Sequence, residues 1–426
     1  MNIYLTSLGC RLNEAELGSW AREFRRHGYR ITQYGGEAAD LVVLNTCAVT
    51  SEAVRKSRQL IRKVQRDNPN AKLVVSGCYA SLPGTKPDLP GIDLLVDNVD
   101  KDQLPEITIR ELALPIMPTL ASEPGENALF ARGRNRSFVK VQDGCRHRCT
   151  FCIVTQTRGE ERSRGVTDIV EEINHQTQAG IKETVLTGVH LGGYGKDLST
   201  DLHALIKTIL RDTDVPRLRL GSLEPWDLHE DFMQLFENQR LMPHLHLPLQ
   251  SGCDSVLRRM GRRCDTTNFA QLVETARRKI DDLSITSDII VGFPGETEKE
   301  WQTSRHFIEA IGFAHLHIFS YSPRAGTRAA TLPNQIPIAQ KRRRSRELHA
   351  LATQMKREFL SVNLDREVDV LWESTTDGTL CAGYTPNYIR VRVVAPDPKA
   401  LNNQIRNASL VKVADDGEHI VAEFKD

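Results

Sequence analysis

The most informative absence in this 426-residue sequence is that of a long apolar run. No uninterrupted apolar stretch reaches the roughly 18 residues that a membrane-spanning helix needs. The first residues, Met1 to Gly9, also lack a basic leader followed by an apolar core, which a secretory signal would have. We therefore expect a soluble, cytoplasmic protein with no membrane partner. Charge of one sign is not in excess either, because the formal net charge is +1, so total charge excludes little.

Nine cysteines are present. Disulfides rarely form in a reducing compartment, so this number of cysteines points instead to metal or redox chemistry. Six of them form two sets of three, one spread between Cys10 and Cys78 and one packed between Cys145 and Cys152. We interpret the remaining three as ordinary thiols: Cys253, Cys264 and Cys381.

The compact set has the sequence Cys145-Arg-His-Arg-Cys149-Thr-Phe-Cys152. Four thiolates normally complete an iron-sulfur cluster, so three leave one iron open to another ligand. This spacing, with an aromatic residue before the last cysteine, resembles the radical S-adenosylmethionine (SAM) signature. The alternatives are a structural zinc site, which usually pairs C-x2-C units with matching His or Cys partners, and chance spacing of structural thiols.

The dispersed set lies in a region, up to about Glu111, where short apolar runs alternate with helical patterns, as is typical of a small parallel α/β sheet. Cys10, Cys47 and Cys78 each follow a predicted strand. The carboxyl ends of parallel strands share a crevice, where helix N-termini would favour thiolates, so we expect a second cluster site there. Taken singly, each cysteine is more often a buried small hydrophobe. The predicted strands are 3–8, 41–45 and 73–76, and the predicted helices 14–27 and 53–68.

A second region, from about 130 to 360, offers six strand-like runs separated by helical patterns. Six βα units are too few for a complete eight-stranded barrel, and they predict a partial (β/α)6 barrel. The Cys145 run directly follows the first of these strands, where barrel active sites lie. The predicted strands are 137–142, 183–187, 218–222, 244–249, 285–291 and 315–321, and the helices include 166–179, 201–212 and 298–311.

The third region, from about Asn363, changes to short strands without helices, which predicts a small OB-like β-barrel. Such barrels often bind oligonucleotides, and a packing module is the alternative. The segment 363–426 holds seven Lys or Arg against eleven Asp or Glu, so its net charge of −4 is poor for binding phosphates by charge alone. The predicted strands are 368–373, 380–385, 389–394, 410–414 and 420–424.

Positive charge is concentrated outside this third region, at two places in the sequence. Eight arginines crowd around the Cys145 run, and a basic run, Lys341 to Arg346, precedes the third region. Such clusters suit a polyanionic partner, whereas the alternative in each case is a solvated basic surface. The eight arginines are Arg132, Arg134, Arg136, Arg146, Arg148, Arg158, Arg162 and Arg164.

Taken together, these motifs resemble those of the tRNA methylthiotransferases, a radical-SAM family, over essentially the full length. The resemblance implies four segments: an N-terminal cluster domain (1–112), a linker (113–129), a radical-SAM core (130–360) and a TRAM-like RNA-binding domain (363–426). The stretches that carry it are Ser7-Leu-Gly-Cys10-Arg-Leu-Asn13, Asn45-Thr-Cys47-Ala-Val-Thr50, Gly77-Cys78-Tyr-Ala80, the Cys145 run, Arg158-Gly159, Ser163-Arg164, His246-Leu-Pro-Leu-Gln-Ser-Gly252 and Asp288-Ile-Ile-Val-Gly-Phe-Pro-Gly-Glu-Thr297.

The resemblance also implies the chemistry. A side chain cannot activate an aromatic C–H bond, so a cofactor must do so. The family uses two 4Fe-4S clusters, here expected on Cys145, Cys149 and Cys152 and on the dispersed set, together with SAM. One cluster would cleave SAM reductively to generate a radical at C2 of an adenine, and the second would deliver sulfur. An electron donor such as flavodoxin or ferredoxin is implied.

Candidate SAM contacts follow successive barrel strands at the same rim. Gly188 follows the second strand, Ser222 and Glu224 the third and Gln250 the fourth. A backbone without Cβ can approach a ligand closely, and the polar side chains could bind it. The alternative is that each residue simply caps or turns the chain. Phe151 is a further candidate, by resemblance only.

Within the family, 45–58 and Tyr321-Ser-Pro-Arg-Ala-Gly-Thr-Arg328 look most like the branch that acts on N6-threonylcarbamoyladenosine at position 37 of tRNA. Sister branches modify isopentenyladenosine in tRNA or an aspartate of a ribosomal protein. A non-catalytic Fe-S RNA-binding redox sensor is the alternative from another class. The base lies in the anticodon loop, where recognition uses splayed bases and backbone contacts. Candidate contacts are 132–136, Arg258, Arg259, Arg262 and Arg263.

Overall fold

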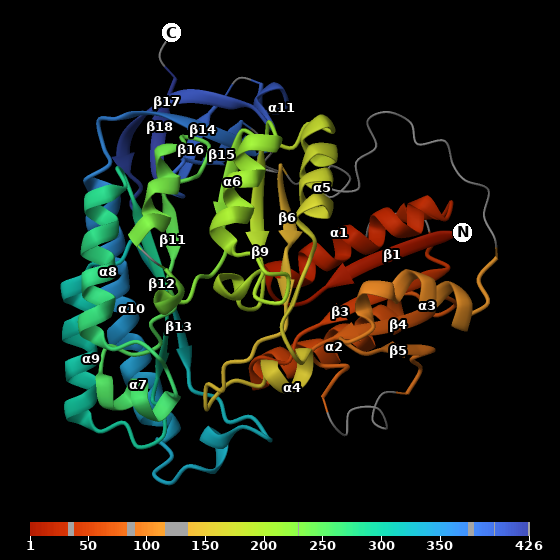
Figure 1. The fold of residues 1–426 in the computed structure, drawn as a ribbon, viewed down its shortest axis with the longest axis horizontal. Coiled ribbons are helices and arrows are strands. Elements are labelled where there is room, and N and C mark those ends of the chain that lie inside the picture. The colour runs from red at the N-terminus through yellow and green to blue at the C-terminus, as the bar shows by residue number, and fades with distance from the viewer. Residues whose placement is uncertain are drawn as a thin grey trace.

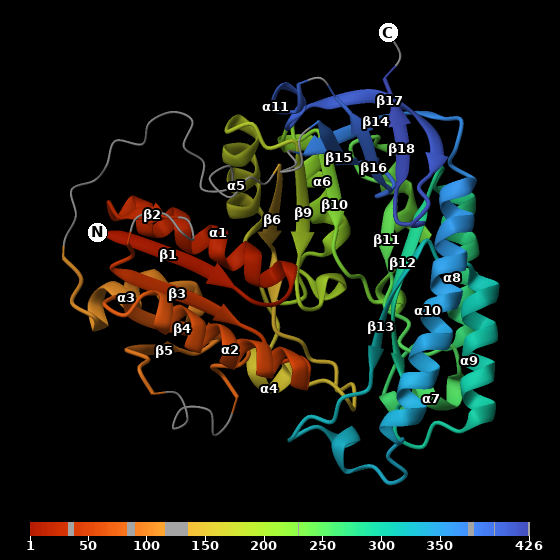
Figure 2. The same ribbon diagram turned by 180° about the vertical axis from the view of Figure 1, so that it is seen from behind.

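Figure 1 shows the computed structural model, in which an N-terminal α/β sheet lies beside a curved central sheet with helices on its outer side. A small β-barrel closes one end of the central sheet in both views (Figures 1 and 2). The structure describes residues 1–32, 38–82, 90–115, 135–228, 230–373, 379–395 and 397–424. Within these ranges no helix combines the length and apolarity needed to cross a membrane. Most of the predicted linker lies outside them.

The N-terminal region forms a five-stranded parallel sheet in the order β2-β1-β3-β4-β5. The three predicted strands are confirmed as β1, β3 and β4. Both faces are apolar because every residue of β3 is buried, and helices cover each face. The prediction missed β2, β5 and α3. The elements are β1 (Asn2–Ser7), α1 (Arg11–Arg26), β2 (Arg30–Thr32), β3 (Leu41–Thr46), α2 (Ser51–Asp67), β4 (Lys72–Gly77), β5 (Leu94–Val96), η2 (Lys101–Gln103) and α3 (Leu104–Glu111).

The central region is the predicted partial barrel. Its six parallel strands form two three-stranded groups, β6-β9-β10 and β11-β12-β13, joined by parallel bridges such as Ser222 to His246. Leu, Ile and Val side chains from the strands and the outer helices form its core. The strands are β6 (Arg136–Lys140), β9 (Glu183–Thr187), β10 (Arg217–Leu220), β11 (His244–His246), β12 (Ser284–Val291) and β13 (His315–Ser320).

Helices connect these strands as the periodicity predicts, and a short hairpin flanks the Cys145 run. The helices are α4 (Val154–Arg158), α5 (Val166–Gln178), η4 (Leu191–Gly193), α6 (Leu202–Asp212), η5 (Pro225–Asp227), η6 (Glu230–Glu237), α7 (Asp254–Met260), α8 (Thr266–Lys279), α9 (Glu298–Ile311), η7 (Arg328–Thr331) and α10 (Ile338–Ser361), and the hairpin is β7 (Gln142–Asp143) with β8 (Arg162–Ser163).

The C-terminal strands close into a barrel in the order β14-β15-β16-β18-β17, as predicted. Two details of the prediction are wrong: β17 begins at Ile405 rather than at residue 410, and a short helix, α11, interrupts the strands. The elements are β14 (Glu367–Glu373), β15 (Leu380–Tyr384), β16 (Arg390–Val394), α11 (Pro398–Leu401), β17 (Ile405–Val413) and β18 (Ile420–Glu423).

This barrel packs on the amino ends of the central strands, opposite the rim that bears the Cys145 run (Figure 1). Asn135 donates to the carbonyl of Trp372 at 2.8 Å and Arg217 to that of Asp369 at 2.7 Å. Arg11, in the N-terminal region, donates to Tyr388 Oη at 3.0 Å. All three regions therefore meet around Tyr388, to which Arg136 of the central region also donates.

Candidate functional site

The Cys145 run forms a loop whose two ends are tied together. Strands β7 and β8 pair on either side of it, and Cys145 N donates to the carbonyl of Gly159 at 3.1 Å. Gly144 lies at φ +75°, and a Cβ there would come within 1.9 Å of the Glu160 carbonyl oxygen, so only glycine fits. The hairpin thus presents the three cysteines as one closed loop.

All three thiols of this loop are free and partly exposed. Backbone N–H groups of His147 and Val154 point at Cys145 Sγ and Cys152 Sγ, each at 3.4 Å. Burial nonetheless raises the pKa of Cys145 to about 11 and that of Cys152 to about 12. A metal ion or cluster replaces those protons on binding. Three free thiols aided by backbone donors fit an iron-sulfur cluster with one open iron.

A histidine pair that the sequence did not suggest braces the loop. His147 Nε2 lies 3.0 Å from His190 Nε2, and His190 contacts Glu161 at 2.7 Å and Asp227 at 2.6 Å. Burial and the neighbouring His190 lower the pKa of His147 to about 4, so it stays neutral. Burial opposes protonation of His190, but its two carboxylate partners outweigh burial and raise its pKa. The only sign of this pair in the sequence was His147, which lies between Cys145 and Cys149.

The candidate SAM residues lie at the predicted rim. Two of them, Gly188 and Ser222, make contacts within the protein itself. A Cβ on Gly188 would meet the Gln142 side chain at 3.0 Å, so its lack of a side chain serves packing. Ser222 is exposed and bridges to His246. Glu224 lies close enough to the Cys145 run to raise the pKa of its cysteines.

Arg262 holds Glu224 in place with contacts of 2.5 and 3.2 Å, and it lies 3.9 Å from Cys149 Sγ and over the Trp226 ring. Arg262 is thus buried beside the cysteine loop. This candidate contact for the anticodon loop is therefore paired with a carboxylate within the protein.

Gln250 and Phe151 complete the predicted set. Gln250 is buried and adopts φ +73°, a conformation that costs a non-glycine residue about 1 kcal/mol or more and that clusters at functional sites. Backbone bonds of Gln250 to Asp288 and Ile290 on β12 enforce this conformation. Phe151 packs against the small cluster that contains Met260.

The dispersed cysteines converge as the strand ends predicted. Cys10 caps α1, Cys47 follows β3, and Cys78 follows β4. A Cβ on Gly9 would lie 3.1 Å from Cys47 Cβ, and Cys78 N donates to the Thr46 carbonyl at 3.1 Å. The three thiols also interact electrostatically with one another. The topology therefore gathers residues that are far apart in sequence.

The expectation that helix N-termini favour thiolates here is not met, because burial dominates. Burial raises the pKa of Cys47 to about 11, although the backbone N–H of Val49 and the positive charge of Arg158 act in the opposite direction. Burial outweighs both because it removes the water that would solvate a thiolate. Here too, bound metal would have to displace a proton.

Arg158 links the two cysteine sets. It lies six residues after Cys152, at the end of α4, and its Nε approaches Cys78 Sγ at 3.3 Å. It also donates to Asn13 at 3.0 Å and to Glu16 at 2.9 Å. With 2% of its surface exposed, it cannot contact a macromolecular partner, which corrects its assignment to the basic surface. The sequence showed this arginine but not its partners.

A buried ion network surrounds Arg158. Lys101 lies 2.5 Å from Glu16 and 2.9 Å from Asp143, and Asp143 accepts from Arg158 at 3.0 Å. Burial alone would raise the pKa of Glu16, but Arg158 and Lys101 outweigh it and hold the pKa at about 2. The pKa of Asp143 is lowered by the same two cations. Glu16 and Lys101 belong to the N-terminal region and Asp143 and Arg158 to the central one, so the network fixes one against the other.

The basic run before the C-terminal barrel is not one solvated face. Lys341 and Arg344 are buried: Lys341 donates to the Tyr321 carbonyl at 2.9 Å and Arg344 to Glu296 at 2.8 Å. Of the arginines around the Cys145 run, Arg146 and Arg148 are exposed, whereas Arg136 lies over the ring of Tyr384. Arg132 and Arg134 lie outside the described residues.

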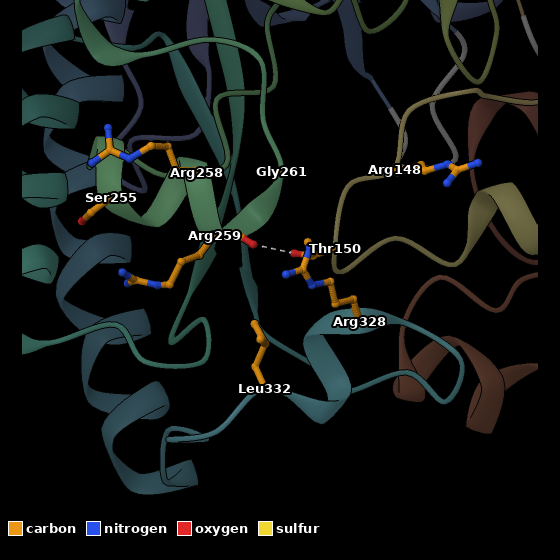
Figure 3. Close-up of a pocket in the computed structure, with 8 residues that line it drawn as sticks. All are labelled: Arg148, Thr150, Ser255, Arg258, Arg259, Gly261, Arg328 and Leu332. Carbon is orange, nitrogen blue, oxygen red and sulfur yellow. Dashed lines mark hydrogen bonds between the residues drawn. The ribbon is translucent and has the colours of Figure 1, made fainter.

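A pocket of about 530 Å³ opens on the outer side of the cysteine loop (Figure 3). The Thr150 hydroxyl donates to the Arg259 carbonyl at 2.9 Å and closes one wall. Arg259 is paired with Glu300, but Arg148, Arg258 and Arg328 are exposed and have no acidic partner among the described residues. The pocket suits an anionic group.

Comparisons with known proteins agree with this geometry. Residues 139–308 match the radical SAM superfamily, and residues 2–92 match a family described as uncharacterized protein family UPF0004. A threonylcarbamoyladenosine tRNA methylthiotransferase, MtaB, of Bacillus subtilis is 34% identical over 90% of this chain and 88% of its own. Its namesake in Thermotoga maritima is 34% identical over 91% and 90%.

A tRNA-2-methylthio-N6-dimethylallyladenosine synthase of Anaplasma marginale is 31% identical over 97% of this chain and 94% of its own. Among solved structures, the radical SAM methyltransferase TsrM of Kitasatospora setae superposes with a TM-score of 0.59 at 15% identity, covering 77% of each chain. That likeness bears on the fold alone. From the curated relatives, the chain belongs to the MtaB methylthiotransferase family of the radical SAM superfamily.

Proposed function

We propose that this protein transfers a methylthio group to C2 of N6-threonylcarbamoyladenosine at position 37 of tRNA. The observation that carries the proposal is Arg158, which follows Cys152 by six residues in the central region and reaches Cys78 Sγ of the N-terminal region at 3.3 Å. Sulfur insertion needs a radical generator and a sulfur source close to one carbon atom. The relatives that bear this activity in their names support the choice of substrate.

The radical SAM family implies a 4Fe-4S cluster and SAM. We assign the cluster to Cys145, Cys149 and Cys152, where it would supply, with SAM, the one-electron chemistry that activates the C–H bond. Glu224, fixed by Arg262, and the Gln250 turn would border the bound SAM. Phe151 would line the same side of the loop.

We assign a second cluster to Cys10, Cys47 and Cys78, as the sulfur source. In support, the three thiols are free and converge at one sheet edge, and Cys78 contacts Arg158. A buried positive side chain beside the site would offset part of the negative charge of cysteine-ligated iron. The His147–His190 pair would hold the Cys145 loop in place.

The partners of the reaction are a tRNA anticodon loop and a one-electron donor such as flavodoxin or ferredoxin. Exposed Arg148, Arg258 and Arg328 could contact phosphates beside the cysteine loop. The C-terminal barrel would add contacts through shape and stacking, because its net charge is −4. We infer that the reaction takes place in the cytoplasm, where its tRNA substrate would be available.

The decisive experiment compares tRNA nucleosides, by mass spectrometry, from cells with and without this protein. We expect 2-methylthio-N6-threonylcarbamoyladenosine to disappear in its absence and to return with the wild-type gene. In vitro, the reduced protein should form 5′-deoxyadenosine from SAM, and methylthio product only on tRNA that already bears threonylcarbamoyl.

Other outcomes would identify the alternatives. Loss of the methylthio derivative of isopentenyladenosine would indicate the sister tRNA activity, which the dimethylallyladenosine synthases represent at 31% identity. A thiomethylated ribosomal protein with unchanged tRNA would indicate the protein-modifying branch. Absence of 5′-deoxyadenosine from a fully loaded, reduced protein would favour a non-catalytic redox sensor.

A further inference from the structure

The segment from Tyr321 to Arg328, between β13 and η7, bridges the two cysteine sites. At one end, Ser322 Oγ lies 2.8 Å from Ser51 Oγ and accepts from Ser51 N at 3.2 Å, four residues after Cys47. At the other end, the Gly326 carbonyl accepts from Gln156 at 2.6 Å, four residues after Cys152. The segment therefore runs between the parts of the chain that follow Cys47 and Cys152.

Arg324 stands between these two anchors. Its carbonyl accepts from Thr327 N at 3.0 Å and from Thr327 Oγ1 at 2.7 Å, in a tight turn that fixes its backbone. Gly326 adopts φ +87° in the same turn, a conformation that favours glycine, and its carbonyl accepts from Gln156. The backbone at Arg324 is thus held from both sides.

The guanidinium of Arg324 is only partly accessible, and its Nε is buried with no hydrogen-bond partner among the described residues. No carboxylate of the described residues forms an ion pair with it, whereas the buried Arg158, Arg262 and Arg344 are each paired with one. Burial lowers the pKa of Arg324, and the nearby Cys47 partly offsets that effect. A donor that is shielded from water and has no acceptor in the protein is costly, so a partly accessible cation with such a donor favours an anionic ligand.

We propose that Arg324 binds the carboxylate of the threonylcarbamoyl group on the substrate base, an inference that rests on the proposed function. Threonylcarbamoyl carries a carboxylate, which a guanidinium can bind through two parallel hydrogen bonds. A dimethylallyl group is neutral and offers no such partner. Arg324 is therefore a specificity-determining residue: it selects the substituent at N6 and orients C2 of the base between the two cysteine sites.

The rival role for Arg324 is that of a counter-charge to Cys47 and its cluster. A counter-charge would act on every substrate alike and would alter the cluster itself. A carboxylate site acts only on substrates with a free carboxylate. These two roles can be separated by changing the protein and the substrate together.

The test uses the reconstituted full-length enzyme and two anticodon stem-loops, one with N6-threonylcarbamoyladenosine and one with its carboxyl methyl ester. Wild type should prefer the free acid by on the order of 100-fold in kcat/KM, the range expected for one desolvated charged pair. Arg324→Gln should lose that factor on the acid and change little on the ester. Arg324→Lys should restore part of it, because it keeps the charge without the planar fork.

Two controls keep the outcomes distinct. Arg346→Gln, an exposed arginine on α10, should behave as wild type on both stem-loops. Iron content and reductive SAM cleavage of Arg324→Gln should match wild type. Equal losses on acid and ester, altered iron content, or no loss at all would each overturn the inference. If wild type itself gives no methylthio product on the free acid, the proposed function fails, independently of Arg324.

Discussion

The two cysteine sites reach similar chemistry by opposite routes. Cys145, Cys149 and Cys152 lie within eight residues on one loop, whose ends a hairpin ties together. Cys10, Cys47 and Cys78 are spread over 69 residues and meet only because three neighbouring parallel strands end at one edge. The first site depends on local geometry, and the second depends on the whole N-terminal sheet.

The surroundings of the two cysteine sites also differ, because the compact site is supported by its own region and the dispersed site by another. The compact loop is braced by neutral His147 and by its hydrogen-bonded partner His190, which belong to the central region. The dispersed site contacts Arg158, a residue of the central region. Damage to the N-terminal sheet or to its docking should thus disable the second site while sparing the first.

The largest effect should come from replacing Cys145, Cys149 and Cys152 together by Ala. We expect iron content to fall from two clusters to one and SAM cleavage to be abolished, because no other set of free thiols lies at the barrel rim. Iron analysis and 5′-deoxyadenosine formation measure this. Cys381→Ala, in the C-terminal barrel, is the control and should change neither. Continued SAM cleavage by the triple variant would refute the assignment of the radical site.

Replacing Cys10, Cys47 and Cys78 by Ala should have a narrower effect. Reductive SAM cleavage should remain detectable, since the compact loop is intact, while methylthio product on tRNA disappears. Both are measured in the same reaction mixture by mass spectrometry. Full product from this variant would mean that these thiols are structural.

Breaking the link between the sites should come next in size. Arg158→Met leaves Glu16 and Asp143 short of one cation in a buried site, which should lower the free energy of unfolding by about 3–5 kcal/mol. Chemical denaturation measures this. Arg146→Met removes an exposed arginine from the same stretch and should change stability by less than about 0.5 kcal/mol. Equal effects of the two changes would contradict a special role for the buried network.

The smallest effect should appear in acid. Glu16 has a pKa of about 2 in the folded protein against an ordinary 4.5, so it stabilises the fold above about pH 4.5 and loses that contribution as the pH falls toward 2. Thermal midpoints of cluster-free protein should therefore drop within that window. Glu16→Gln should be less stable at pH 7 and should show a shallower drop. Identical pH profiles for the two proteins would mean that Glu16 does not carry this dependence.

Most of the fold could be predicted because its strands are long, apolar and separated by turns. All six central strands and the three main N-terminal ones were recognised in this way. The missed β2 and β5 have three residues each, too few for any periodicity to register. The early start of β17 was missed because its first residues, around Arg406 and Asn407, are polar and exposed.

The parts of the candidate site that depend on cysteine spacing or on strand ends could be predicted from the sequence. The parts that depend on ion pairs could not. Strand ends predicted that Cys10, Cys47 and Cys78 converge. Arg158 and Arg262 looked like surface arginines, because nothing in a linear sequence tells which carboxylates will face them. Their partners, Glu16 and Glu224, lie 142 and 38 residues away.

The buried network has a consequence for how the chain is made. Its fully buried charges come as one acid and one base from each region, Glu16 with Lys101 and Asp143 with Arg158, so each buried pair is neutral by itself. Lys140, at the edge of the network, is paired with the exposed Asp102. A nascent chain releases the first pair long before the second leaves the ribosome. The N-terminal sheet can therefore fold with its buried charges paired before the central region is complete. Assembly of the two halves then joins one neutral pair to another and carries no unbalanced charge into the interior.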